Sequence, residues 1–534
     1  MQKSRREMLK TLATLPLLGV LGYGIYKKAR YERIRHHANQ LFNLDLRPTQ
    51  RIVPVDNSRT IRIGLIGYGL RGKMLMRALG FAEPSYIDKL KNDMARDPKN
   101  KRYETFMNQD SLNVEIVAVC DIFETNAIRA MEAAANVYKE GTNGRMGKKA
   151  KRYMNYHELL ADPDVDAVVI ATPDHWHGTI AIEAAHAGKH IYLEKPMSWT
   201  VPETYLVREA VHASGVVFQL GHQNRQIDSY EKAKAIIQKG ILGPVSLVQV
   251  STNRNTPNGA WVYDIDKTAN EKTIDWKQFM PDSQRWKEYA DYMKRNHLEH
   301  FMGPSAIEEF SLERFFRWRC WWDYSTGLSG DLLTHDYDAV NQIMEVGIPY
   351  SASSSGGIYF YKDGRTVPDV LQTTFEFPDK NLTLLYSATL SSSQQRGRLF
   401  MGHDATLEVG ENLVLTVDAN STRYKQQIKD GIINPGVPVC TYVPGKDKLD
   451  VVSSATEQYF AKRGLMYTYV DGKQYDTTYL HMREWLECIR QGLTPSCGIQ
   501  QAFEESITAH MGTRAYLEAR TMFWDKEKEE IVRD

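Results

Sequence analysis

Three side chains that lie far apart in the sequence have types that could together move a proton from a hydroxyl group. Asp331 and His335 are four residues apart, so on a helix they share one face. A carboxylate beside an imidazole can orient the ring and raise its basicity, as a general base requires. Lys195 precedes Pro196, which favours an extended backbone there. A partly desolvated lysine can donate a hydrogen bond to a substrate hydroxyl and stabilise negative charge.

These residue types also have purely structural interpretations. Lys195 can be an ordinary surface lysine, and Asp331 with His335 can be a helix cap beside a core histidine. Their meaning therefore depends on the elements that position them.

A glycine-rich turn is the strongest positioning signal. The apolar run from Ile61 to Ile66 leads into Gly67-x-Gly69-x-x-Gly72, and helical spacing follows. In a dinucleotide-binding turn the first glycine permits the bend, the second admits a diphosphate, and the third lets helix and strand pack closely. The helix N-terminus adds partial positive charge. A structural glycine turn is the alternative. The predicted cofactor-binding residues here are Gly67, Tyr68, Gly69, Leu70, Arg71 and Gly72.

An acidic residue ends the second predicted strand, 114–120. Asp121 at that strand end can accept hydrogen bonds from the ribose hydroxyls of NAD and would repel the extra phosphate of NADP. The usual distance from the glycines is about 20 residues. Here it is about 50, because an irregular, charged surface insertion is predicted over 82–112. We expect NAD in preference to NADP, with a helix N-cap as the alternative role of Asp121.

Two further strands end in polar residues. The strand 167–172 is followed by Pro173 and a loop with His175 and His177, and the strand 190–193 is followed by Glu194 and Lys195. Alternating strands and helices predict a doubly wound parallel sheet, whose ligands bind beyond the carboxyl ends of the strands. Thr172, Pro173, His177, Glu194 and Lys195 are therefore predicted to bind the cofactor. His175-x-His177 alone is a weak metal signal, and we predict no metal.

Net charge and cysteine spacing argue against a nucleic-acid-binding protein and against a disulfide-rich or zinc–thiolate protein. The chain has 534 residues and a net charge of +1, which argues against nucleic acid as a partner. Five scattered cysteines without CxxC spacing argue against a disulfide framework or a zinc–thiolate site.

The N-terminus has the pattern of an export signal. Ser4 to Lys10 resembles the twin-arginine signal, which exports folded proteins, and an apolar stretch over 11–26 follows. No small-x-small cleavage site stands out, so we expect an exported protein in the periplasm, with this stretch retained as a membrane anchor in preference to cleavage. A buried helix is the alternative.

Several motifs in order resemble the Gfo/Idh/MocA oxidoreductase family. They are Gly67-x-Gly69-x-x-Gly72, Ala171-Thr172-Pro173 with His177, Ala187-Gly188-Lys189-His190 and Glu194-Lys195-Pro196. The resemblance implies an N-terminal Rossmann domain and a C-terminal α/β domain with a large, mostly antiparallel sheet. It implies tightly held NAD or NADP, action on sugars and cyclitols in carbohydrate metabolism, and a catalytic role for Lys195. It also implies that His335 is the base and that Asp331 binds and orients. Ser325-Thr326-Gly327 departs from the family's usual run of glycines.

The second domain carries the other predicted site residues. Gly221-x-Gln223-x-Arg225 matches a family motif that lines the substrate entrance, so Gln223 and Arg225, with Asp331 and His335, are predicted to bind substrate. A helix-capping turn is the alternative for this motif. The aromatic segment 253–316 is predicted to be a lid or an oligomer contact of a homo-oligomer, with Arg254 to Pro257 facing substrate. Alternating strands over 350–415 predict an antiparallel sheet, and helices are expected over 480–492 and 499–519.

The predicted organisation is a signal or anchor (1–26), an arm (27–58), a Rossmann NAD-binding domain (59–220), a substrate and oligomerisation domain (221–525) and a frayed charged tail (526–534). The predicted function is NAD(P)-dependent oxidation of a hydroxyl group of a sugar, glycoside or cyclitol. Two alternatives stay open. One is a glycosidase or lyase that oxidises its substrate transiently and recycles bound NAD, and the other is a non-catalytic sugar-binding scaffold.

Overall fold

The computed structural model describes residues 41–44, 58–138, 148–256, 260–302, 309–394, 396–410, 412–442, 467–470 and 473–533. The predicted signal and most of the arm lie outside these residues. None of the helices within them combines the length and apolar character required to cross a membrane.

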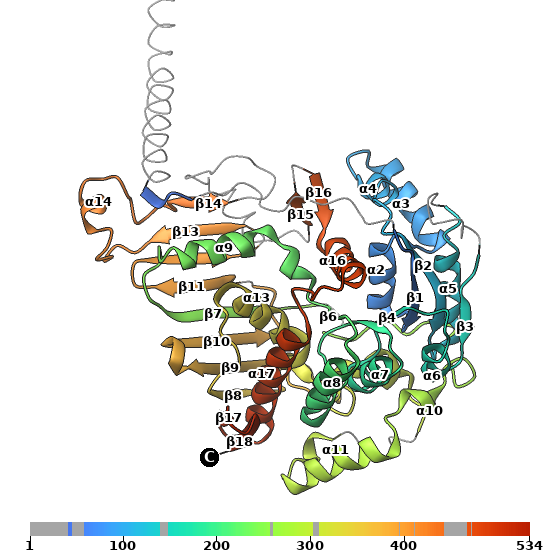
Figure 1. Cartoon of the computed structure of the whole chain (residues 1–534). Coiled ribbons are helices and arrows are strands. Elements are labelled where there is room, and N and C mark those ends of the chain that lie inside the picture. Colours follow the sequence, from blue (N-terminus) through green and yellow to red (C-terminus); the bar gives the residue numbers. More distant parts are fainter. Residues whose placement is uncertain are drawn as a thin grey trace, which may run out of the picture.

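The first domain is built on a six-stranded parallel sheet (Figure 1). In sheet order the strands are β3 (Lys151–Tyr153), β2 (Val114–Cys120), β1 (Ile61–Ile66), β4 (Ala167–Ile170), β5 (His190–Leu193) and β6 (Phe218–Leu220). The helices of this domain are α2 (Leu70–Ala78), α5 (Glu124–Ala135), α6 (Tyr156–Leu160), α7 (Asp174–His186) and α8 (Val201–Ser214). The strand order reverses beside β1, which pairs with both β2 and β4, so the doubly wound prediction is confirmed.

The predicted irregular insertion is helical. It folds into α3 (Pro84–Arg96) and α4 (Arg102–Met107), whose apolar faces enclose a small core of their own. The charged residues that made it look irregular lie mainly on the solvent side.

The prediction for His175 and His177 was also wrong in one respect, because both lie in the first turn of α7 and not on a loop.

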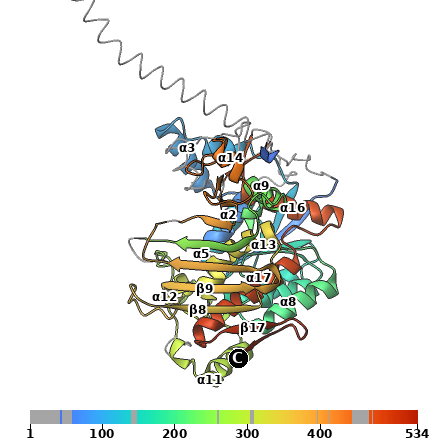
Figure 2. The ribbon, with the colours of Figure 1, turned by 90° about the vertical axis from the view of Figure 1, so that its left-hand side faces the viewer.

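The second domain contains a ten-stranded sheet, seen from its uncovered side in Figure 2. In sheet order the strands are β14 (Cys440–Tyr442), β13 (Leu413–Val417), β12 (Ala405–Val409), β11 (Arg398–Gly402), β7 (Val245–Asn253), β10 (Leu382–Thr389), β9 (Val370–Phe377), β8 (Ser351–Gly357), β17 (Met522–Asp525) and β18 (Glu530–Arg533). Only β7 and β10 pair in parallel, which confirms the mostly antiparallel prediction.

Helices α9 (Asp228–Gln238), α13 (Thr334–Met344) and α17 (Ile499–Leu517) cover one face of this sheet (Figure 1). The tail predicted to be frayed instead contains β18, which pairs with β17 at the sheet edge. The remaining elements are η1 (Gln223–Gln226), η3 (Trp318–Cys320), the π-helical turn η4 (Ser329–Leu333), η5 (Pro378–Lys380), α14 (Lys425–Lys429), β15 (Tyr467–Val470) and β16 (Lys473–Asp476).

A late segment of the chain completes the core of the first domain. Helix α16 (Thr477–Gln491) was predicted as part of the second domain, but it packs against α2. Its buried side chains Tyr479, Trp485 and Leu486 join the apolar cluster that holds β1 and β2. Sequence periodicity showed this apolar face but not its partner, which is some 400 residues away.

The aromatic segment after β7 contains several helical pieces, of which one is long. It contains α10 (Trp276–Phe279), α11 (Ser283–Arg295), η2 (Glu299–Phe301) and α12 (Leu312–Phe316). The carbonyl of Phe279 accepts from the Trp176 indole at 2.9 Å and lies 2.6 Å from His175 Nε2, so this segment is attached to α7 of the first domain.

Candidate active site

A cavity of about 2590 Å³ lies where the carboxyl ends of the parallel strands face the second domain. The first domain contributes the glycine turn, Asp121, Thr172 and Lys195 to its wall. The second domain contributes residues of β7, α10, η3, η4 and α13, including His335. The structure therefore brings the predicted cofactor turn, Lys195 and His335 around one space.

The glycine turn is shaped to leave room for a ligand. A Cβ atom on Gly67, whose φ is +91°, would lie 2.7 Å from the carbonyl oxygen of Ala171, and one on Gly72 would lie 2.2 Å from that of Gly67. A Cβ on Gly69 would meet no atom within 4 Å. Gly67 and Gly72 are therefore required by the fold, whereas Gly69 keeps a space open at the N-terminus of α2. This is the arrangement that a diphosphate needs.

Asp121 links the turn to the end of β2. Its carboxylate accepts hydrogen bonds from the backbone N–H groups of Tyr68 (2.6 Å) and Phe123 (2.8 Å). Burial raises the pKa of Asp121 to about 6, even though these hydrogen bonds lower it. The side chain still lines the cavity, so its remaining lone pairs can accept from ribose hydroxyls, as NAD requires.

The other residues of the turn divide into two groups. Leu70 and Arg71 line the cavity, and Arg71 Nε donates to Glu194 Oε1 at 2.8 Å. Tyr68 and Gly72 do not line it. The Tyr68 ring is buried, and its hydroxyl donates to Glu83 at 3.0 Å, so any cofactor contact of Tyr68 must come from its backbone.

The start of α7 offers a polar group without a protein partner. The buried Thr172 hydroxyl lines the cavity and makes no hydrogen bond within the described residues. His177 lies between two carbonyl oxygens, that of Thr172 (2.8 Å from Nε2) and that of Pro196 (2.6 Å from Nδ1). It thus connects the strand ends that carry Pro173 and Lys195. The unpaired hydroxyl fits a cofactor with polar substituents at this position.

Lys195 and Asp331 form an ion pair across the two domains. Lys195 Nζ lies 3.0 Å from Asp331 Oδ1 and donates to the Asp331 carbonyl. Arg319 Nε donates to the same Oδ1 at 3.2 Å, and Trp261 Nε1 donates to Oδ2 at 3.0 Å. Burial raises the pKa of Asp331, but Lys195 and Arg319 outweigh it and hold this pKa well below its usual range. Asp331 is therefore a carboxylate that positions Lys195.

His335 is not paired with Asp331 as the i, i+4 spacing predicted. The oxygens of Asp331 are taken by Lys195, Arg319 and Trp261, and no hydrogen bond joins it to His335 within the described chain. The physical reason is η4, whose π-helical turn at Asp331 precedes α13, so the 3.6-residue periodicity is broken there. His335 still lines the cavity, and burial, followed by Lys195 and His222, lowers its pKa well below the usual value.

The two residues predicted at the substrate entrance have different positions. Gln223 lines the cavity and donates to the Tyr192 hydroxyl (2.7 Å) and to Glu194 (3.0 Å). Arg225 is not among the cavity-lining residues. It is buried in an ion pair with Asp338, in which Arg225 Nη2 lies 2.6 Å from Asp338 Oδ1. Unlike Gln223, Arg225 thus joins η1 to α13 instead of lining the cavity, and its predicted substrate contact stays a prediction.

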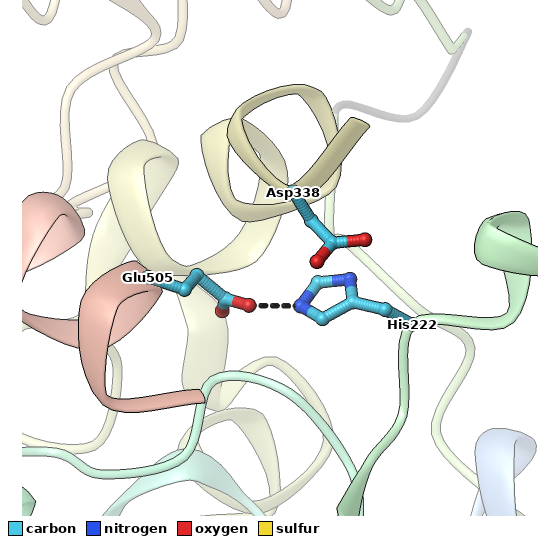
Figure 3. A group of neighbouring side chains, drawn as sticks. All are labelled: His222, Asp338 and Glu505. Atoms are coloured by element: carbon cyan, nitrogen blue, oxygen red, sulfur yellow. Dashed lines mark ion pairs between the residues drawn. The ribbon is translucent and has the colours of Figure 1, made fainter. Parts of the chain in front are cut away.

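Next to that pair, a buried histidine faces two carboxylates (Figure 3). His222, Asp338 and Glu505 have possible ligand atoms within 4.8 Å of one another, as a metal site would. The charges balance without a cation, because Arg225 pairs with Asp338 and His222 pairs with Glu505. Burial lowers the pKa of His222, but Glu505 and Asp338 raise it more. We therefore interpret the group as an ion-pair network.

Two residues that contact Asp331 were not predicted from the sequence. Trp261 and Arg319 contact Asp331 but lie in a segment without clear periodicity. Arg254, predicted to face substrate, does line the cavity.

The first domain is similar to known proteins. Residues 61–222 match the family described as "Oxidoreductase family, NAD-binding Rossmann fold". The chain is 33% identical over 136 residues to inositol 2-dehydrogenase of Salmonella typhimurium, which is 25% of this chain and 37% of that protein. It is 40% identical over 87 residues to scyllo-inositol 2-dehydrogenase (NAD⁺) of Bacillus subtilis, which is 16% of this chain and 25% of that protein. The chain thus matches about a third of these relatives' length or less.

The fold extends beyond the aligned segment. A solved levoglucosan dehydrogenase in complex with NADH superposes with a TM-score of 0.54 at 17% identity, over 87% of this chain and 98% of that one. Both domains therefore share the architecture of that protein.

Proposed function

Because residues 61–222 match the model of the Gfo/Idh/MocA oxidoreductase family, we propose that the protein oxidises a hydroxyl group of a sugar, glycoside or cyclitol with NAD. The observation that carries the proposal is the shared cavity. In it the open glycine turn, Lys195 and His335 face one space, and Lys195 is ion-paired with Asp331. The two inositol dehydrogenase relatives support the cyclitol part of this substrate class.

The residues that would hold the cofactor are those at the strand ends: the glycine turn, Asp121, Thr172 and Glu194. Bound NAD supplies the acceptor for the hydride that leaves the substrate carbon. Asp121 would bind the ribose, and the open space at Gly69 would admit the diphosphate. We propose that the cofactor is held tightly.

Lys195 and His335 would act on the substrate hydroxyl. Lys195, kept in place by Asp331, donates a hydrogen bond to the substrate oxygen and stabilises negative charge as the C–H bond breaks. His335 accepts the hydroxyl proton. Its Nδ1 is buried without a partner, which leaves Nε2 as the nitrogen that can meet a substrate. Its lowered pKa keeps the ring neutral, and so able to accept a proton, at neutral pH.

The test combines cofactor and product analysis. Mass spectrometry of the purified protein would identify the bound nucleotide, and a panel of sugars, glycosides and cyclitols would then be assayed for NADH and for product. Stoichiometric NADH with an oxidised sugar supports the proposal. Release of aglycone without net NADH would instead indicate transient oxidation with recycled NAD. A sugar recovered intact, with no turnover by any member of the panel, would contradict both.

We also propose that the protein is exported to the periplasm and assembles as a homo-oligomer. The twin-arginine pattern at Arg5 and Arg6 and the apolar stretch over 11–26 support export with membrane retention. Cell fractionation of the full chain and of the Arg5→Lys/Arg6→Lys variant tests this. Equal periplasmic amounts of both proteins would contradict export by this signal.

Light scattering of the purified protein tests the proposed homo-oligomer, and a monomeric mass would count against it.

A further inference from the structure

We propose that the substrate carries a negatively charged substituent, such as the carboxylate of a uronic acid, and that Arg254 and Arg319 bind it beside Lys195. This inference rests on the proposed function and deepens it. It specifies an acidic sugar or glycoside and assigns an anion subsite at the substrate end of the cavity.

The first observation is a group of three cations on the cavity wall, Lys195, Arg254 and Arg319. Asp331 Oδ1 is shared between Lys195 (3.0 Å) and Arg319 (3.2 Å), and Oδ2 accepts from Trp261. Asp331 is thus paired with two of the three cations. Its oxygens are already engaged by other donors, and no ion pair joins it to Arg254 within the described residues.

The second observation concerns the side chain of Arg254. Its backbone N–H donates to the Thr389 carbonyl at 2.9 Å, which fixes the residue where β7 ends beside β10. Its side chain is exposed and makes no hydrogen bond or ion pair in the part of the chain that the structure describes. It lies close enough to the reaction centre to lower the pKa of both Asp331 and His335.

Two neighbouring carboxylates, Asp336 and Asp174, are already engaged by other groups. Asp336 pairs with Arg398 at 2.7 Å and also accepts from Thr252, so that pair is already neutral. Asp174 accepts from the backbone N–H (3.0 Å) and the hydroxyl (2.8 Å) of Thr326, and burial raises its pKa. A neutral sugar would offer Arg254 no charged partner, whereas an acidic one would.

The chemistry of the three side chains fits an oxyanion. A guanidinium presents parallel N–H donors that match a carboxylate or a sulfate, and such charge-assisted hydrogen bonds are stronger than neutral ones. Arg319 also lies over the Trp318 ring, 4.1 Å from its centroid, so one face of its guanidinium is supported. An anionic substituent would accept hydrogen bonds from Arg254 and Arg319. Lys195 would remain directed at the reacting hydroxyl.

The test compares matched acidic and neutral substrates. We would measure kcat and KM of the holoenzyme for methyl glucuronides, methyl glucosides and a 6-sulfated glucoside, in the wild type and in Arg254→Ala, Arg254→Lys and Arg520→Ala. The last is a control, because Arg520 is exposed and is not among the cavity-lining residues. We expect kcat/KM to favour an acidic substrate, and Arg254→Ala to reduce that preference at least tenfold through KM. Arg254→Lys should restore part of it, and Arg520→Ala should not change it.

A preference for neutral substrates that is unaffected by Arg254→Ala would overturn the inference. The sulfated substrate distinguishes a general anion subsite from one specific for carboxylates. Calorimetric binding of methyl glucuronide separates this inference from the proposed function. Arg254-dependent binding without NADH formation would keep the subsite and reject the dehydrogenase activity, whereas neutral-sugar oxidation without such binding would do the reverse.

Discussion

The imidazole of His222 lies edge-on against that of His335, with ring centroids 5.4 Å apart and an interplanar angle of 88°. On its other side, His222 forms a buried ion pair with Glu505 of α17 (Figure 3). The charged imidazole of His222 therefore lies next to His335, the proposed base. This charge, together with burial and Lys195, lowers the pKa of His335 and keeps its ring neutral.

The first prediction concerns the charge of His222 in its ion pair with Glu505. The double variant His222→Gln/Glu505→Gln removes both charges and keeps amide groups of similar size. Because the charge of His222 lowers the pKa of His335, its loss should raise that pKa, and the acidic limb of kcat/KM should move to higher pH. The pH–rate profile measures this, with the melting temperature as a control for folding. An unmoved limb in a folded variant would show that His222 does not set the ionisation of His335.

The second prediction uses two glycines of the same turn. Gly69→Ala should leave the melting temperature of the cofactor-free protein nearly unchanged but weaken NAD binding, because the new methyl group enters the open space. Gly72→Ala should lower the melting temperature, because its Cβ would clash with the Gly67 carbonyl at 2.2 Å. Thermal unfolding with and without NAD measures both effects. Tight NAD binding by Gly69→Ala would mean that the diphosphate lies elsewhere.

The third prediction is a pH dependence of cofactor binding. The pKa of Asp121 is raised to about 6, so its carboxylate becomes protonated as the pH falls through that value. A protonated acid loses acceptor capacity for the ribose hydroxyls, and NAD affinity should therefore fall below about pH 6. Asp121→Asn should bind NAD more weakly at pH 7 and lack this dependence. Titration calorimetry from pH 5 to 8 is the measurement, and identical profiles would refute the assigned role.

The fourth prediction separates structure from substrate binding at Arg225. Arg225→Met leaves the buried Asp338 without its partner, and such a change costs about 3–5 kcal/mol in the free energy of unfolding. Arg225→Met/Asp338→Leu should recover much of that loss, since no buried charge stays unpaired. Denaturant unfolding measures both variants. A stable Arg225→Met protein with a raised KM would instead place Arg225 at the substrate.

The fifth prediction addresses Lys195 and the scaffold alternative. Lys195→Met should lower kcat by about 10²–10⁴-fold, the usual range for a group that assists proton transfer. NAD binding should change much less, because the glycine turn and Asp121 do not depend on the ammonium group. Steady-state assays with calorimetry of NAD binding give both values. Full activity in this variant would exclude the proposed role of Lys195.

Local patterns were enough to predict much of the fold. The glycine turn and the strand ends that carry Asp121, Thr172 and Lys195 were all predicted, because each depends on a few adjacent residues. The structure gathers these residues around one cavity, as a parallel sheet must at its carboxyl edge.

The errors arose where distant or irregular contacts decide the outcome. The π-helical turn at Asp331 broke the spacing that was expected to pair it with His335. Arg225 is bound to Asp338, 113 residues further along the chain, and no spacing rule indicates such a pairing. Arg319 and Trp261 likewise reach Asp331 through tertiary structure alone.

The position of α16 has a consequence for biosynthesis. The core around β1 and β2 is complete only when Trp485 and its neighbours have been added to it. During translation the glycine turn is made early, but its domain must wait for nearly the whole chain to leave the ribosome. Cofactor loading is thus expected to follow synthesis of the complete polypeptide, and a fragment that ends at residue 222 should be neither stable nor able to retain nucleotide.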